Sequence, residues 1–447
     1  MKNKTHLKRE LGLAAATSIV VGNMIGSGIF TSPQSLAQVA NPMVTVLAWV
    51  ITGLGSILLA LSFANLGTKY PATGGPIVYT HKAFGEFMAF LVSWTFWLGS
   101  WIGNAAIITA VIRYLTTFFP ALGTNGILAF AVSSLLLWIF TYINYKGVKN
   151  AGYVSIITTV IKIGVILVFM VIACIGFDAA NLTTSASEEA NSLGALPAAI
   201  AITLWSFVGL ESATISGGEI KNPEKNIKRS TVIGTGLAVL IYIFLSVLAM
   251  GSMPQNMLAT TQAPLADIMN YVTGATWGGY FISGGIVIAA AGALSGWVLT
   301  TARLAYAAGE DGLFPKFFAK VHPKYNTPVV ALVITSLCTN ALLLLNYVSN
   351  LTEAFDFMIN LATLSFIPAY ALTACAEIIL TFRKEHKLTL LSFLKQGFLS
   401  LIAFGYAIYI IYGAGSESAM WIFILMLVGI PFYVYKKLQG EVGNSIK

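Results

Sequence analysis

Two ionisable side chains lie deep inside long apolar stretches of this 447-residue chain. Lys162 lies about 11 residues into a stretch at 151–177 and Glu211 about 15 residues into another at 196–219, so at about 1.5 Å per residue each is close to the centre of a bilayer. A charge at that depth costs roughly 2.5–3.5 kcal/mol, and such residues usually mark the path of an ion or a substrate. Either residue is therefore a candidate proton carrier. The alternative is a structural role, in which Lys162 contacts backbone carbonyls exposed in the first apolar stretch.

Three of the nine tryptophans lie far from the membrane surfaces, where tryptophan is usually enriched. Trp101, Trp205 and Trp297 fall deep within the third, sixth and eighth apolar stretches. An indole at that depth either packs as a large apolar group or stacks on a cation. Together with Asn104, one turn beyond Trp101, they favour an aromatic pocket that contains a hydrogen-bonding group.

Two stretches that should form uninterrupted helices contain glycine-rich runs. The first stretch holds GNMIGSG at 22–28, with Ser27 at mid-membrane depth, and the sixth holds GLESATISGG at 209–218. Glycine destabilises a helix interior by about 1 kcal/mol relative to alanine, and in hydrocarbon the freed backbone groups need partners inside the protein. Breaks five stretches apart are typical of an inverted-repeat transporter that holds its substrate at the breaks. The alternative is that these glycines only allow close helix packing.

The rest of the chain consists almost wholly of stretches that could position these residues in a membrane. It is 57% hydrophobic and only 9% charged, whereas a soluble domain carries about 25% charged residues. We predict an all-α integral membrane protein without a soluble domain, because stretches of the roughly 20 residues needed to cross a bilayer recur along the whole sequence. The twelve predicted transmembrane helices are 12–38, 43–67, 86–118, 126–145, 151–177, 196–219, 231–251, 275–308, 328–347, 356–381, 396–413 and 419–436.

The formal net charge of +8 indicates membrane topology rather than a nucleic-acid partner. Lysine and arginine gather in alternate loops, including 2–9, 221–229 and 383–395. Such an excess marks cytoplasmic loops, so both termini are predicted to lie in the cytoplasm, with the protein multi-pass in the cell inner (plasma) membrane. The first apolar stretch is too long for a cleaved signal peptide, and we expect it to be retained.

No metal, cofactor or catalytic centre is expected. Cys174, Cys338 and Cys375 lie within apolar stretches at no metal-ligand spacing. The sequence contains no His-Glu-x-x-His motif and no phosphate-binding loop, which argues against an enzyme. A receptor would need a soluble signalling module, and no segment between the apolar stretches is long enough to form one.

Several motifs resemble the amino acid–polyamine–organocation superfamily. GSGIF at 26–30 is similar to its unwound first helix. Further motifs resemble the bacterial basic amino acid/polyamine antiporters, of the arginine/agmatine and lysine/cadaverine type: WIGN at 101–104, YL at 114–115, LWSFVGLESA at 204–213, KNP at 221–223, SGW at 295–297 and DGLFP at 311–315. The resemblance covers essentially the whole chain.

This resemblance implies a LeuT-like 5+5 inverted repeat with helices 1 and 6 discontinuous. The whole chain, 1–447, would be a single transmembrane transporter domain. Its two repeats would span about 10–177 and about 196–381, and two additional helices at about 396–436 are often used to form a homodimer.

The resemblance also implies which residues hold the backbone groups of a substrate. Ser27 and Gly28, at the start of the second half of helix 1, would bind the carboxylate through backbone N–H groups and the positive end of the helix dipole. Carbonyl groups of Met24, Trp205 and Val208 would bind the α-amino group.

Other matching positions would serve the substrate side chain and the transport cycle. Asn104 would contact the head group of the substrate, and Trp297 would stack against it. Trp205 would close the outer side of the pocket. Glu211 would couple protonation to transport.

Three residues depart from the antiporter pattern. Phe96 stands where the antiporters place a tyrosine near the key glutamate, and Leu361 falls near their pocket serine. Lys162 resembles the lysine of proton-coupled and exchange-type amino acid permeases, where it stands in for a sodium ion. A mid-membrane carboxylate surrounded by indoles nevertheless suits a cation, so the sequence predicts an exchanger of cationic amino acids and their decarboxylated amines that works by alternating access. The alternative is a proton-coupled or exchanging permease for neutral amino acids.

Overall fold

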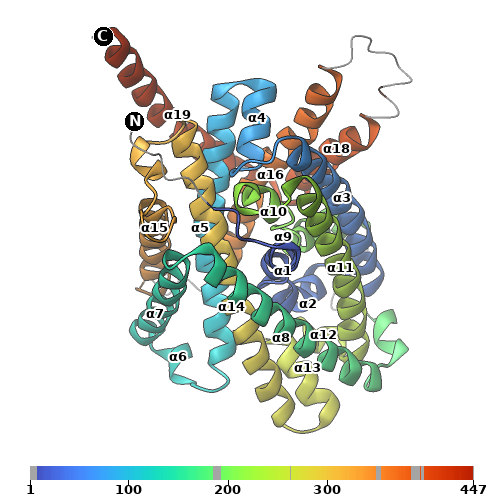
Figure 1. Ribbon diagram of the computed structural model, residues 1–447. Coiled ribbons are helices and arrows are strands. Elements are labelled where there is room, and N and C mark those ends of the chain that lie inside the picture. Colours follow the sequence, from blue (N-terminus) through green and yellow to red (C-terminus); the bar gives the residue numbers. More distant parts are fainter. Residues whose placement is uncertain are drawn as a thin grey trace.

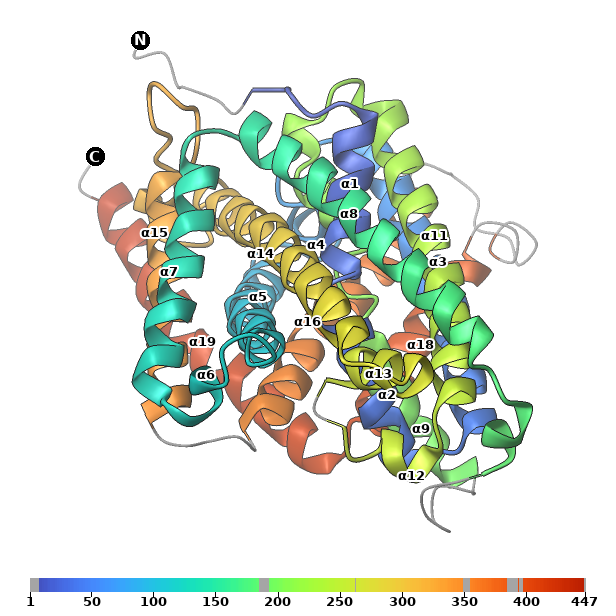
Figure 2. The ribbon, with the colours of Figure 1, turned by 90° about the horizontal axis from the view of Figure 1, so that it is seen from below.

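The computed structural model describes residues 8–184, 193–261, 263–348, 354–383, 393 and 397–445, and these residues form a bundle of helices without a β-strand (Figures 1 and 2). The basic segments predicted at 2–9 and 383–395 fall largely outside the described residues. The helices of the first half are α1 (Leu13–Met24), α2 (Gly28–Val39), α3 (Pro42–Lys69), α4 (Pro76–Phe84), α5 (Glu86–Leu115), α6 (Ala121–Thr124), α7 (Gly126–Tyr145) and α8 (Val148–Ile175).

The second half contains further long helices and several short ones. They are α9 (Leu196–Trp205), α10 (Ser212–Ile215), α11 (Pro223–Ser252), α12 (Gln255–Leu258), α13 (Pro264–Thr273), α14 (Trp277–Glu310), α15 (Val329–Val348), α16 (Ala354–Phe382), α18 (Phe398–Gly413) and α19 (Ser416–Ser445). Single 3₁₀ turns include η1 (Ala179–Thr183), η3 (Leu193–Ala195), η4 (Gly217–Glu219) and η5 (Lys316–Ala319).

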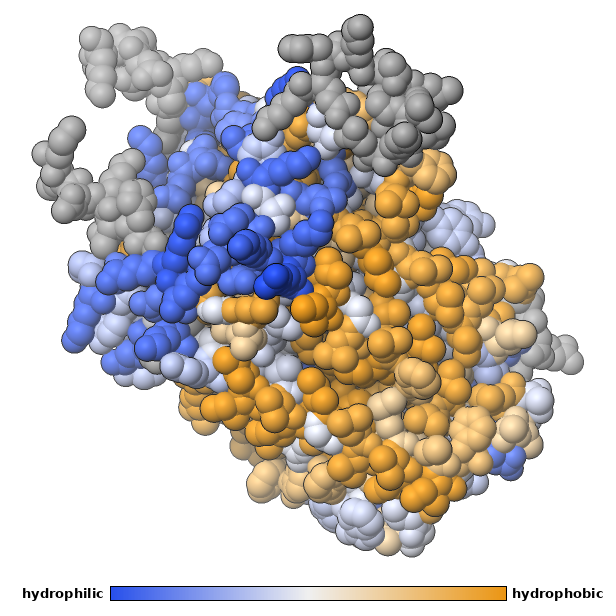
Figure 3. Space-filling model, turned by 45° about the vertical axis from the view of Figure 1, so that its right-hand side comes forward, coloured by the Kyte–Doolittle hydropathy of each residue, from blue (hydrophilic) through white to orange (hydrophobic). Residues whose placement is uncertain are grey.

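Ten helices of the described chain are long and apolar enough to cross a membrane. Two shorter apolar helices, at Leu193–Trp205 and Phe398–Gly413, accompany them. The predicted count of twelve is not reached by this criterion, because the sixth predicted span is interrupted after Trp205 and the eleventh forms a helix of only 16 residues. A broad apolar surface below a hydrophilic cap (Figure 3) fits a protein that is surrounded by lipid along most of its length.

Both glycine-rich runs coincide with interruptions of a helix. α1 ends at Met24 and α2 begins at Gly28, so three residues link two half-helices. In the sixth predicted span, α9 ends at Trp205 and α10 begins at Ser212. The prediction that these two spans are discontinuous agrees with the structure.

Gly209 allows the two breaks to approach each other. Its φ of +116° lies in a region that residues with a side chain rarely adopt. A Cβ atom at this position would lie 2.9 Å from the Cβ of Asn23 in the other break. Glycine is therefore required at 209 both for its backbone conformation and for this close contact.

The broken helices lie in the interior of the bundle. α1 packs against α8, α11 and α14, and α9 packs against α2, α3 and α18 (Figure 1). α19 lies at the periphery, against α5 and α16. The first described residues lie in the upper half of Figure 1, and the end of α19 lies at its top.

We predict that Gly209→Ala destabilises the protein by about 1–3 kcal/mol, because alanine would hold a strained backbone conformation and contact Asn23. Thermal unfolding in detergent would show this as a lower midpoint. Gly236→Ala, on α11 with no atom within 4 Å of the added Cβ, is the control and should leave the midpoint unchanged or raise it. Equal midpoints for the two variants would contradict the requirement for glycine at 209.

Candidate functional site

A small cavity lies where the two breaks meet. Its volume is about 10 Å³, close to the least that holds one water molecule. An amino acid can therefore enter only when the surrounding side chains separate. We call it the central cavity, and its lining residues are Asn23, Met24, Gly26, Ser27, Gly28, Ile107, Trp205, Val208 and Trp297.

Most of the substrate-binding residues predicted from the sequence share this cavity. Those that line it are Met24, Ser27, Gly28, Trp205, Val208 and Trp297. Asn104 is not among the lining residues, although it is buried on α5, and its Oδ1 has no hydrogen-bond partner among the described residues.

The start of α2 is arranged to receive an anion. No side-chain hydrogen bond caps this end of the helix, and the first N–H groups of a helix point out of it without intrahelical partners. Trp205 donates a hydrogen bond from Nε1 to Oγ of Ser27 at 3.3 Å. A Cβ atom at Gly28 would lie 2.7 Å from Oγ of Ser206 and 2.8 Å from Cδ1 of Trp205. Glycine at 28 therefore allows α2 to approach the end of α9.

Asn23 joins both breaks to α14, and sequence reasoning did not assign it a role. Its Nδ2 atom donates to Oγ of Ser212 at 2.8 Å and to Oγ1 of Thr300 at 3.0 Å. Its carbonyl oxygen accepts a hydrogen bond from Nε1 of Trp297 at 3.1 Å. The available signal was a polar side chain inside the glycine-rich run of a membrane span.

Glu211 is buried beside α16 and does not line the central cavity. Its Oε2 accepts hydrogen bonds from the hydroxyl of Tyr370 at 2.8 Å and from the backbone N–H of Gly209 at 3.3 Å. Its Oε1 has no partner among the described residues. Tyr370 was also missed by sequence reasoning, because a tyrosine within an apolar span does not reveal which helix it faces.

Phe96 contacts the aromatic cluster next to this carboxylate. Its ring packs edge-on against Phe366, with centroids 4.7 Å apart. Phe366 in turn stacks on Tyr370 at 6.4 Å and lies 5.6 Å from the ring of Trp297. A chain of aromatic contacts therefore connects the central cavity to the partner of Glu211.

Lys162 lies on α8 and contacts the last turn of α1, next to the first break. The side chain is fully buried on α8, and Nζ donates to the carbonyl oxygen of Gly22 at 2.8 Å. This is the carbonyl contact that was considered from the sequence. Neighbouring Thr159 donates to the carbonyl of Ser18 at 3.2 Å, so α8 holds two successive turns of α1.

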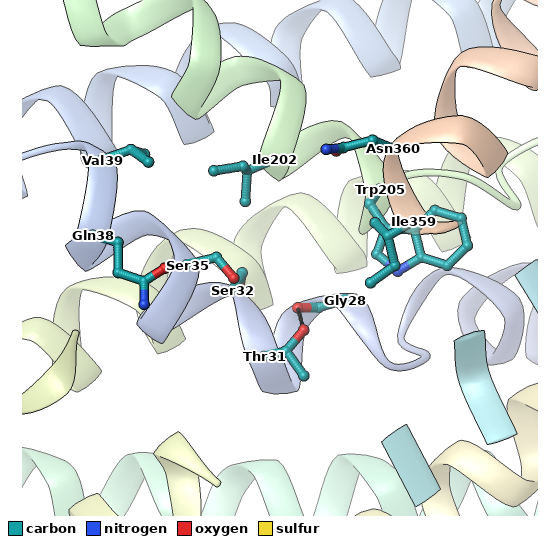
Figure 4. Close-up of a pocket in the computed structure, with 10 residues that line it drawn as sticks. All are labelled: Gly28, Thr31, Ser32, Ser35, Gln38, Val39, Ile202, Trp205, Ile359 and Asn360. Carbon is teal, nitrogen blue, oxygen red and sulfur yellow. Dashed lines mark hydrogen bonds between the residues drawn. The ribbon is translucent and has the colours of Figure 1, made fainter. Parts of the chain in front are cut away.

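A second cavity, of about 190 Å³, lies on the other side of Trp205 (Figure 4). Hydroxyl and amide side chains of α2 face Ile202 and Asn360 across it, and none of the described residues that line it is charged. We call it the outer cavity, after the topology predicted from the sequence. Trp205 and Gly28 border both this cavity and the central one. The indole of Trp205 thus separates the two cavities. The lining residues are Gly28, Thr31, Ser32, Ser35, Gln38, Val39, Ile202, Trp205, Ile359 and Asn360.

We predict that Gly28→Ala weakens substrate binding by at least about tenfold, or about 1.4 kcal/mol, because the added methyl group displaces Trp205 and Ser206. Equilibrium binding of a radiolabelled substrate to purified protein measures the effect. Gly284→Ala on α14 is the matched control, since this glycine does not line the central cavity and its Cβ would meet its nearest atom, Cζ of Phe118, at 3.5 Å, which is ordinary contact. Equal affinities of the two variants would count against a role of this contact in binding.

Comparison with known proteins gives a consistent result across the chain. A profile described as amino acid permease matches residues 11–434. A protein of Chlamydia felis named arginine/agmatine antiporter is 30% identical over 99% of this chain and 93% of its own length. Proteins of the same name from Chlamydia pneumoniae and Chlamydia trachomatis serovar L2 are 30% and 31% identical over 97% and 95% of this chain, and over 91% and 89% of their own lengths.

Proposed function

The chain belongs to the amino acid permease family of the amino acid–polyamine–organocation superfamily, and from this premise we propose that it exchanges a cationic amino acid for its decarboxylated amine by alternating access. Relatives named arginine/agmatine antiporter match nearly the whole chain at 30% identity, which supports this pair of substrates. The observation that carries the proposal is the central cavity, where the uncapped start of α2 meets the rings of Trp205 and Trp297.

The fold proposed for this function is a LeuT-like 5+5 inverted repeat of twelve transmembrane helices in one domain. The repeats would span about 10–177 and 196–381, with α18 and α19 as additional helices and α19 available for a homodimer. Interruptions in the first span of each proposed repeat support this arrangement. The first and last described residues both lie in the upper half of Figure 1, which supports an even number of spans. The basic loops support a cytoplasmic location of this side in an inner membrane.

The backbone at the two breaks would bind the groups common to all amino acids. N–H groups at Ser27 and Gly28 would bind the carboxylate, because the helix dipole favours an anion at the start of α2. The α-amino group would donate hydrogen bonds to the carbonyls of Met24, Trp205 and Val208, all of which border the cavity.

Neutral groups would hold the cationic head of the side chain. None of the described residues that line the central cavity is acidic. The faces of Trp205 and Trp297 can attract a cation, and the unpaired Oδ1 of Asn104 can accept a hydrogen bond from it. Trp205, between the central and outer cavities, would act as the outer gate.

Proton coupling is assigned to Glu211, acting with Tyr370 and the aromatic cluster that includes Phe96. The carboxylate has a neutral hydroxyl partner at 2.8 Å and a second oxygen without a partner among the described residues. It can therefore change its charge without leaving an opposite charge unpaired. The ring contacts of Phe96 and Phe366 would transmit the resulting structural change to Trp297.

A second candidate function is a proton-coupled or exchanging permease for neutral amino acids. Two observations favour it: the lining of the central cavity lacks an acidic side chain, and the ammonium group of Lys162 binds the carbonyl of Gly22 beside the first break. In this case a change in the charge of Lys162, rather than of Glu211, would move α1.

Counterflow in proteoliposomes distinguishes the two candidate functions, exchange of cationic amino acids and transport of neutral ones. We expect internal arginine or agmatine to accelerate uptake of external labelled arginine by at least about tenfold, whereas internal alanine and leucine should not. The reason is that the binding site of an exchanger returns to the outside fastest when a substrate is bound to it. Acceleration by small neutral amino acids but by no cationic amino acid or amine would favour the second function.

Substitution of Glu211 and of Lys162 separates the two coupling mechanisms. We expect Glu211→Gln to remove the dependence of exchange on a proton gradient, because the amide cannot gain or lose the proton, while binding changes by less than about threefold. Tyr370→Phe, which removes only the hydroxyl partner, should shift the pH dependence of exchange without abolishing it. Loss of proton dependence in Lys162→Met but not in Glu211→Gln would instead identify the lysine as the coupling group.

A further inference from the structure

Arg303 and Glu219 form an ion pair that is completely buried. Arg303 lies on α14, and Glu219 ends η4, shortly after the sixth-span break. Nε and Nη2 of Arg303 donate to Oε2 and Oε1 of Glu219 at 2.8 and 3.0 Å, and neither side chain is exposed. Sequence analysis missed the pair, although Arg303 lies several residues inside the predicted span at 275–308.

Stability alone does not explain such a pair. The Coulomb attraction of a buried ion pair is largely offset by the loss of water around both charges, and apolar replacements are often no less stable. The two-pronged geometry, however, gives a contact that is either fully made or broken. This property suits an element that has two positions.

The backbone of Glu219 also binds the segment that precedes α1. Its carbonyl oxygen accepts hydrogen bonds from the N–H groups of Glu10 and Leu11, both at 2.9 Å. Lys221 donates from its N–H to the carbonyl of Leu11 at 2.8 Å. The segment before α1 is therefore fixed to the segment after α10, and Arg303 fixes both to α14.

A row of buried polar groups extends from the central cavity to this ion pair. Asn23, which lines the cavity, donates to Ser212 and Thr300. One turn further along the same two elements lie Ser216 and Arg303. Three atoms in this row have no hydrogen-bond partner among the described residues: Oδ1 of Asn23, Oγ of Ser216 and Nη1 of Arg303.

A third cavity begins beyond the ion pair. Its volume is about 610 Å³, and residues of α4 and of the end of α14 line it, whereas residues of α2 and α9 line much of the outer cavity. Ala307, one turn beyond Arg303, borders it, and so does Thr73, which pairs with Ser216 in an isolated bridge. The lining residues are Ala72, Thr73, Val78, His81, Lys82, Ala307, Glu310 and Asp311. The ion pair thus lies between this inner cavity and the central one.

We propose that the inner passage runs between α10–η4 and α14, that the Arg303–Glu219 pair closes it, and that after opening the two charges bind the ends of a passing amino acid. Arg303 would bind the carboxylate and Glu219 the amino group. This inference rests on the proposed exchange function. A decarboxylated amine lacks the carboxylate and would contact only Glu219.

Accessibility of Ser216 tests the closure. A Ser216→Cys variant, in a background in which the three native cysteines are replaced by serine, is labelled with a membrane-impermeant methanethiosulfonate in inside-out vesicles. Adding Glu219→Gln and Arg303→Gln should raise the labelling rate at least about tenfold, because the neutral pair separates readily. The matched control is Glu86→Gln with Lys437→Gln, which neutralises an ion pair at 3.0 Å whose side chains are 38% and 49% exposed, and it should leave the rate unchanged.

Efflux tests the role in transport and the binding of the carboxylate. Proteoliposomes loaded with labelled arginine or agmatine are diluted into medium without substrate, where an exchanger releases little. The double variant should release agmatine at least about tenfold faster than the unmodified protein. The acceleration of arginine release should be at least about threefold smaller than that of agmatine release, because only arginine loses a partner for its carboxylate. Equal acceleration of both solutes would overturn the carboxylate-binding part.

Unchanged labelling and unchanged efflux in a correctly folded double variant would overturn the closure. If the double variant does not elute as a monodisperse species, Glu219→Asp with Arg303→Lys replaces it. That pair keeps both charges but loses the two-pronged geometry, and it should give at least about a threefold rise in labelling. Labelling needs no substrate, so a wrong assignment of the transported solute would not mimic a failure of the closure.

Discussion

Backbone groups that leave a helix inside a membrane must find partners within the protein, and the arrangement around the two breaks depends on this constraint. Four neighbouring helices each direct a donor to a carbonyl oxygen in or near a break. The pairs are Lys162 with Gly22, Trp297 with Asn23, Tyr242 with Ser206 and Tyr114 with Phe30, at 2.8 to 3.1 Å. The donors come from α8, α14, α11 and α5. The same contacts that stabilise the breaks therefore surround the central cavity with polar groups.

The two breaks also depend on each other for space. Gly209 lies against Asn23, and Gly28 lies against Ser206 and Trp205. A shift of one half-helix therefore displaces the residues at the other break. Trp205 borders the outer cavity, and the row of polar groups that begins at Asn23 ends at the Arg303–Glu219 pair. Movement at the breaks would therefore displace residues at both ends of the proposed passage.

Much of the central site could be predicted because its residues belong to the glycine-rich runs themselves. Gly26–Gly28 and Gly209 have a local signature, and the resemblance to known transporters supplied the roles of their neighbours. Tyr370, Asn23 and the Arg303–Glu219 pair were not predicted, because their importance depends on contacts between helices far apart in the sequence. The number of helices long enough to cross a membrane is lower than the predicted number of spans for a related reason. The broken sixth span and the 16-residue helix α18 are shorter than a regular membrane helix.

The partners of the buried charges divide them into two kinds. Glu211 contacts a hydroxyl and a backbone N–H, and Lys162 contacts a carbonyl oxygen, so each can lose its charge while its partner remains neutral. Arg303 and Glu219 contact each other, and neutralising either one would leave an uncompensated charge in a fully buried site. In the proposed mechanism a proton would therefore bind at Glu211 or Lys162, whereas the Arg303–Glu219 pair would open by separation of its two charges. A transporter needs both kinds of group, because a change of charge must drive the cycle and a closed contact must prevent leakage between its steps.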